Sequence, residues 1–234
     1  MVSNTKEPKS NLINSTTSAK DITDWPGAFG IYQISKTAMT KNFKTFIKLA
    51  ISFGVFYILD IAINLSTRNN SGINVLVRTV FELLGILLSS TLIFSAIRSV
   101  GDETVSVGDA FSAVTSNAIN IIITGIFVGV LAVLSILLLI IPAFFVIPRI
   151  YLAIYFVVDQ KLGPIESIKT SWDVTKGNVG KVYGILGVGI LIFLPIITVI
   201  GLIATVYFGF MYLAAPAVLY VYITKNQKEK LLNN

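Results

Sequence analysis

Four ionisable side chains lie inside otherwise apolar stretches of this 234-residue chain: Asp60, Arg78, Glu82 and Arg149. A charge at the centre of a bilayer costs roughly 2.5 to 3.5 kcal/mol on insertion scales, so each of these residues needs a partner or water. The charges of the two carboxylates and the two guanidinium groups sum to zero. Counted from the ends of their apolar segments, all four are expected in the outer leaflet, so the sequence predicts one intramembrane polar cluster.

Three interpretations of this cluster stay open. Arg78 and Glu82, at i and i+4, together with Arg149 against Asp60 or Glu82, would form a buried salt-bridge network that fixes the helix register. In the second interpretation, the charged side chains extend to the outer lipid headgroups. In the third, they line a polar vestibule that binds an ion, a headgroup or a small solute, and the protein is a transporter.

Other chemistries are excluded by composition. The chain has no cysteine and no histidine, so disulfides, thiolate or imidazole metal sites, cysteine nucleophiles and histidine-based proton transfer are all absent. Glu166 and Ser167 are expected on the solvated face of a short helix, and no nucleophile–base pair is recognisable. We therefore expect no enzyme, no cofactor and no metal site.

The elements that carry these charges are expected to be transmembrane helices. Hydrophobic residues make up 54% of the chain and charged ones 13%, and the mean hydropathy is +0.81, whereas soluble domains are about 25% charged. In lipid the backbone must satisfy its own hydrogen bonds, which favours helices. The sequence therefore predicts an all-α polytopic membrane protein in contact with the lipid bilayer, and the net charge of +6 indicates an orientation signal, not nucleic-acid binding.

Six apolar segments are long enough to cross about 30 Å of hydrocarbon. They occupy residues 46–65, 75–97, 118–140, 142–158, 182–200 and 203–223. The membrane domain is thus expected over residues 25–224. Residues 1–24 are rich in Ser, Thr, Asn and Lys and are expected to form a disordered cytoplasmic tail, and residues 225–234 a short basic one.

The distribution of basic residues predicts the orientation. Of the 18 lysines and arginines, 15 fall in the two tails, on the approach to the first segment and its start, or in the connections that follow the second and fourth segments. Lysine and arginine accumulate on the cytoplasmic side of membrane proteins. We therefore expect a multi-pass protein of the cell membrane with both termini in the cytoplasm.

A short motif recurs before the first, third and fifth apolar segments: AMTKN at 38–42, AVTSN at 113–117 and DVTKGN at 173–178. Its asparagines, Asn42, Asn117 and Asn178, are 75 and 61 residues apart. Asparagine readily adopts turn conformations and bonds free carbonyls. We interpret each as the corner where a surface helix turns into a transmembrane hairpin, in three repeats over about 29–98, 105–159 and 163–224.

The third surface helix shows the expected amphipathic period most clearly. Ile165, Ile168 and Trp172 recur at i, i+3 and i+7, which places them on one face. The charged residues are expected on the other face: Glu166, Lys169, Asp173 and Lys176. Such helices bind anionic headgroups or a protein partner. This pattern favours an accessory or scaffold protein over a transporter, and the oligomeric state stays open.

One stretch also resembles a known family. The run PAFFVIPRIYLAIYFVVDQKLGPIESIKTSWDVTKGN, residues 142–178, has a proline-rich segment entry, Gly-Pro-x-Glu-Ser-x-x-x-Ser and Lys-Gly-Asn. Over about 142–200 it resembles the membrane domain found with glycerophosphoryl diester phosphodiesterases and related uncharacterised bacterial six-helix proteins. The resemblance implies a six-helix bundle with interfacial helices. It does not imply the phosphodiesterase activity, which needs a separate domain with histidine and carboxylates.

The predicted orientation can be tested by labelling intact cells. A membrane-impermeant reagent should reach a label site placed at Lys176 or at the carboxyl end only after the membrane is opened. Labelling of either site from outside the intact cell would contradict the predicted orientation.

Overall fold

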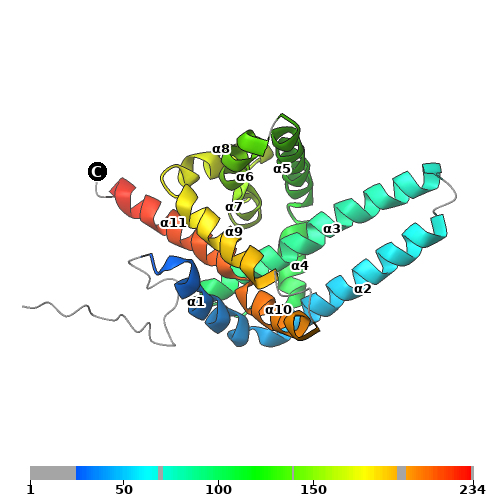
Figure 1. The fold of residues 1–234 in the computed structure, drawn as a ribbon, viewed down its shortest axis with the longest axis horizontal. Helices are drawn as coiled ribbons and strands as arrows, with labels where there is room; N and C mark the ends of the chain where they lie inside the picture. The colour runs from blue at the N-terminus through cyan, green and yellow to red at the C-terminus, as the bar shows by residue number, and fades with distance from the viewer. Residues whose placement is uncertain (1–24, 68–70, 139, 194–198, 233–234) are drawn as a thin grey trace, which may run out of the picture.

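The computed structural model describes residues 25–67, 71–138, 140–193 and 199–232. Within these ranges the chain forms helices and no strand, which confirms the predicted all-α class (Figure 1). The helices are α1 (Gly27–Lys41), α2 (Phe43–Thr67), α3 (Ser71–Val100), α4 (Val107–Thr115), α5 (Ala118–Leu138), α6 (Ile140–Ile150), α7 (Ala153–Gln160), α8 (Pro164–Thr175), α9 (Val179–Phe193), α10 (Val199–Tyr212) and α11 (Ala215–Leu232).

Five helical stretches in the described part are long and apolar enough to cross a membrane. They are Phe43–Thr67, Gly72–Val100, Ala118–Leu138, Pro142–Gln160 and Val206–Lys225. A further apolar helix, Val179–Ile192, is shorter. The predicted fifth segment, 182–200, includes residues 194–198, which lie outside the described residues, as does the predicted tail at 1–24.

Two of the five stretches are interrupted. Turn residues separate α6 from α7 at 151–152 and α10 from α11 at 213–214. An interruption frees backbone carbonyls, and in lipid these need a partner within the protein. Buried serines supply it: Ser171 of α8 donates to the carbonyl of Arg149 at 2.6 Å, and Ser35 of α1 donates to the carbonyl of Met211 at 2.6 Å.

Pro148 frees a third carbonyl, inside α6. Proline has no N–H, so the carbonyl four residues earlier, that of Phe144, loses its intrahelical donor. The hydroxyl of Tyr183 on α9 donates to this carbonyl, and the two rings lie 6.5 Å apart. One proline thus determines where α9 bonds to α6.

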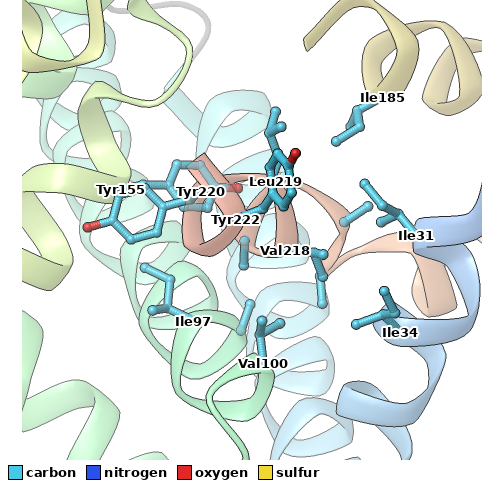
Figure 2. Packing of buried hydrophobic residues seen from close by; sticks show 14 of the residues in the cluster. Ile31, Ile34, Ile97, Val100, Tyr155, Ile185, Val218, Leu219, Tyr220 and Tyr222 are labelled. Carbon is cyan, nitrogen blue, oxygen red and sulfur yellow. The ribbon is translucent and has the colours of Figure 1, made fainter. Parts of the chain in front are cut away.

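The main core surrounds α11. Val218, Leu219 and Tyr220 are buried against Ile31 of α1 and Ile97 of α3 (Figure 2). Helix α1 packs against α11 as well as α9 and α10, so the first and last helices of the described chain are in contact. Correspondingly, α4 packs against α3, and α8 packs against α5, α6 and α7. Each of these three short helices therefore covers the helix that precedes it in the chain or, for α1, the last one.

The α2–α3 hairpin extends away from this core (Figure 1). Only the first part of α2 is buried, at Phe46 and Leu49. Farther along, large apolar side chains such as Ile58 and Leu76 are exposed. Exposed apolar side chains on helices of this length indicate contact with lipid.

Candidate functional site

Three of the four intramembrane charges lie on the α2–α3 hairpin. Asp60 and Glu82 line a cavity of about 260 Å³ between the two helices. Asn64 donates to the Asp60 carboxylate at 3.0 Å. The cavity is otherwise mainly aromatic, with Phe53, Phe56, Tyr57 and Phe81 in its wall. Aromatic faces and carboxylates both attract cations, so this cavity has the chemistry of a cation site.

Arg78 supplies the opposite charge next to this cavity. Its Nε lies 3.9 Å from Glu82 Oε1, at the predicted i, i+4 spacing. The side chains are 66% and 72% exposed, so the pair is not a buried network within this chain. Exposed pairs contribute little to stability in water. At membrane depth the pair instead lowers the cost of holding each charge.

Arg149 lies elsewhere. Its Nη1 is 3.4 Å from the carbonyl oxygen of Trp172, and its guanidinium carbon is 5.9 Å from the centre of the indole ring. The structure therefore does not bring all four charges together. The expected depth of Arg149 was counted along residues 142–158 as one straight helix without neighbours. In the structure α8 packs along α6, and its Trp172 contacts Arg149.

Each of the three motif asparagines is the last residue before a longer apolar helix, in the connection that follows a short one. Asn42, Asn117 and Asn178 lie directly before α2, α5 and α9. Their backbone carbonyls accept the first helical hydrogen bonds, from the amides of Phe46, Ile121 and Val182 at 3.1, 3.2 and 3.2 Å. This is the geometry of a helix N-cap. Each asparagine thus lies where a longer apolar helix begins, and the corner between a surface helix and a transmembrane hairpin stays a prediction.

The side chains of these asparagines differ in what they hold. That of Asn42 is 7% exposed and joins the α3–α4 connection: it donates to Ser99 Oγ and to the Glu103 carbonyl at 2.9 Å each, and accepts from the Val105 amide at 3.1 Å. The corner of α2 is therefore bound to the end of its own hairpin.

The other two corners are held more lightly. The Asn117 amide donates to the carbonyl of Val157 on α7 at 3.0 Å. Within the described residues, the Asn178 amide donates locally, to the carbonyl of Val174 at 3.1 Å.

The side chains of α8 are not distributed as predicted, because Ser167, which was expected on the solvated face, is fully buried. The buried residues of α8 are Ser167, Ser171, Val174 and Thr175. Ile165 and Trp172 are 61% and 38% exposed, on the outward side with Glu166, Lys169 and Lys176. The hydroxyls turn inward because they donate to carbonyls, Ser171 to another helix and Ser167 and Thr175 within their own. The apolar and basic side chains consequently share one exposed surface.

A second polar cluster, which joins residues near the ends of α3 and α7 to Tyr220 of α11, was missed by sequence reasoning. Tyr220 Oη donates to Asp159 Oδ2 at 2.7 Å and accepts from Gln160 Nε2 at 2.8 Å. Arg98 Nη2 lies 4.0 Å from Asp159 Oδ1, and its Nη1 lies 3.5 Å from Glu103 Oε2. Arg98 was counted only among the basic residues of a connection, and Asp159 was assigned no role. Their position at the ends of two spans, with a tyrosine near the end of a third, was the available signal.

The fold and these sites define an all-helical, multi-pass membrane protein that contacts lipid through its apolar helices. In comparisons with family models, curated proteins and solved structures, the chain matches none of them. The resemblance of residues 142–200 to the membrane domain of the phosphodiesterase proteins therefore stays a prediction.

The unequal bonding of the three corners predicts unequal stability effects. Asn42→Ala leaves the Val105 amide and the Glu103 carbonyl without this partner, so we expect a loss of about 2 kcal/mol in the free energy of unfolding. Asn178→Ala, the matched control, removes one local bond and should cost less than about 1 kcal/mol. Unfolding with sodium dodecyl sulfate in mixed micelles measures both, and equal losses would contradict the assigned role of Asn42.

Proposed function

We propose that this chain is a non-enzymatic accessory or scaffold protein of the cell membrane, whose short helices bind anionic lipid headgroups and dock a protein partner. The outward surface of α8 carries the proposal. On it Trp172, Ile165, Lys169 and Lys176 are exposed together. A tryptophan and apolar side chains that reach lipid, beside lysines that reach phosphates, are typical of an interfacial helix.

Other basic residues near the short helices support the same proposal. Lys181 Nζ lies 4.5 Å from the ring centre of Tyr222 and 5.4 Å from that of Trp25. Lys161 Nζ lies 3.5 Å from Ser116 Oγ, so it joins the end of α7 to the end of α4. Cations held against aromatic rings at helix ends suit the headgroup region.

The proposal includes three repeated units, six crossings and cytoplasmic termini, with the likeness to the phosphodiesterase-associated membrane domain as its family context. One sequence register supports the repeats. Ser35, Ala110 and Ser171 each lie seven residues before a corner asparagine, and all three are fully buried. The two serines, on α1 and α8, bond carbonyls at the helix interruptions that these short helices cover. The alanine is on α4, which packs against the uninterrupted helix α3.

Lipid that copurifies with the protein tests this function. After purification in mild detergent, we expect anionic phospholipid to be enriched over the bulk membrane. Lys169→Gln with Lys176→Gln should reduce that enrichment, because it removes two exposed charges worth about 1 kcal/mol each near an anionic surface. Lys48→Gln, an exposed lysine on α2, is the control. A lipid composition equal to that of the membrane would contradict the proposal.

The cavity of Asp60 and Glu82 favours a second candidate, a transporter of cations or small solutes. If the cavity lines a path, proteoliposomes should take up tetraethylammonium, and Glu82→Gln or Asp60→Asn should abolish most of the uptake because the neutral side chains lose their attraction for the cation. Glu103→Gln, away from the cavity, serves as the control. Uptake no faster than in protein-free vesicles would exclude this candidate for the probe.

A further inference from the structure

A second cavity lies between α6 and α9, apart from the charges of the hairpin. Its volume is about 390 Å³, and its wall is almost wholly apolar, with Ile147, Pro148, Tyr183, Gly187 and Ile190 among the lining residues. Ligand pockets of proteins span roughly 300 to 1,000 Å³. The cavity is therefore large enough for part of a ligand, and its wall fits a hydrocarbon chain.

Two features of the sequence make this groove. Pro148 frees the Phe144 carbonyl, and the Tyr183 hydroxyl binds it, so a long side chain joins the two helices at this level. Gly187 contributes no side chain, and a Cβ built there would meet no atom within 4 Å. The space beside Gly187 is open because nothing in the described chain fills it.

An arginine directly follows the groove-lining Pro148 along the chain. Arg149 is the residue after Pro148, so their Cα atoms are about 3.8 Å apart. In the described part of the chain, no carboxylate oxygen lies within 4.0 Å of the Arg149 guanidinium. Its recorded contacts are the carbonyl and the ring of Trp172. The guanidinium group of Arg149 is thus held beside Trp172, and no carboxylate of the described residues neutralises its charge.

We propose that the groove binds one anionic phospholipid, with an acyl chain beside Gly187 and the phosphate on Arg149. The charge complementarity selects this occupant: a guanidinium binds phosphate through two parallel N–H donors, and the apolar wall excludes a free phosphate as the whole ligand. In an anionic lipid such as phosphatidylglycerol, no cation within the headgroup offsets the negative phosphate. In phosphatidylcholine the quaternary ammonium of the choline offsets it. The site deepens the proposed function, since it makes one headgroup contact specific.

The two tryptophans of the chain allow a direct measurement. In a Trp25→Phe background the remaining tryptophan, Trp172, reports on lipid near Arg149. The protein in detergent is titrated with phosphatidylglycerol or phosphatidylcholine brominated on the acyl chains, because bromine quenches nearby indole fluorescence. We expect saturable quenching, with phosphatidylglycerol bound at least roughly tenfold more tightly, in line with one charge-assisted contact.

Two variants separate the parts of the site. Gly187→Leu fills the groove and should abolish saturable quenching by both lipids; Gly129→Leu, on α5 at a glycine whose added Cβ also meets no atom within 4 Å, should leave it unchanged. Arg149→Gln should remove the preference for phosphatidylglycerol, and Arg149→Lys should restore part of it. Circular dichroism and gel filtration show whether each variant is folded.

The result that overturns the proposal is quenching by phosphatidylglycerol that Gly187→Leu leaves unchanged in the folded protein, or equal binding of the two lipids by the unaltered groove. Failure of the general lipid-binding function looks different. In that case Lys169→Gln with Lys176→Gln leaves the copurified lipid unchanged, while the Trp172 titration still saturates.

Discussion

The need to satisfy every backbone carbonyl in a medium without water determines how these helices pair. Pro148 and the two helix interruptions release carbonyls that no residue of their own helix can bind. In each case a hydroxyl from another helix supplies the donor: Tyr183 for Phe144, Ser171 for Arg149 and Ser35 for Met211. The short helices α1 and α8 are thereby fixed against the spans. They are structural parts of the membrane domain and also carry surface that faces outward.

The features that the sequence predicted well depend on neighbours along the chain. Apolar segments long enough to span, and an asparagine where one helix ends and the next begins, follow from local hydropathy and from capping chemistry. Asn42, Asn117 and Asn178 accordingly lie directly before α2, α5 and α9. The pair of Arg78 and Glu82 was predictable for the same reason, because residues four apart on one helix are adjacent.

The features that it did not predict depend on contacts between distant segments. Arg149 was placed by counting residues along a straight helix, but the interruption after it and the packing of α8 along α6 bring it to Trp172. The faces of α8 were assigned by separating apolar from charged side chains, whereas the structure exposes both kinds and buries the hydroxyls. In lipid the apolar side chains can stay outside, and the hydroxyls are the groups that need the protein interior. The bond between Tyr220 and Asp159 likewise joins residues 61 positions apart.

The contact between α1 and α11 sets an order of assembly. Ser35 and its acceptor on Met211 are separated by 176 residues, and Ile31 is buried in a cluster that contains Val218 and Leu219. During synthesis α1 leaves the ribosome long before any of these partners exists. The contacts of α1 with α11 can form only after α11 has been synthesised. Packing of the first helix against the last is therefore a late step in the folding of the membrane domain.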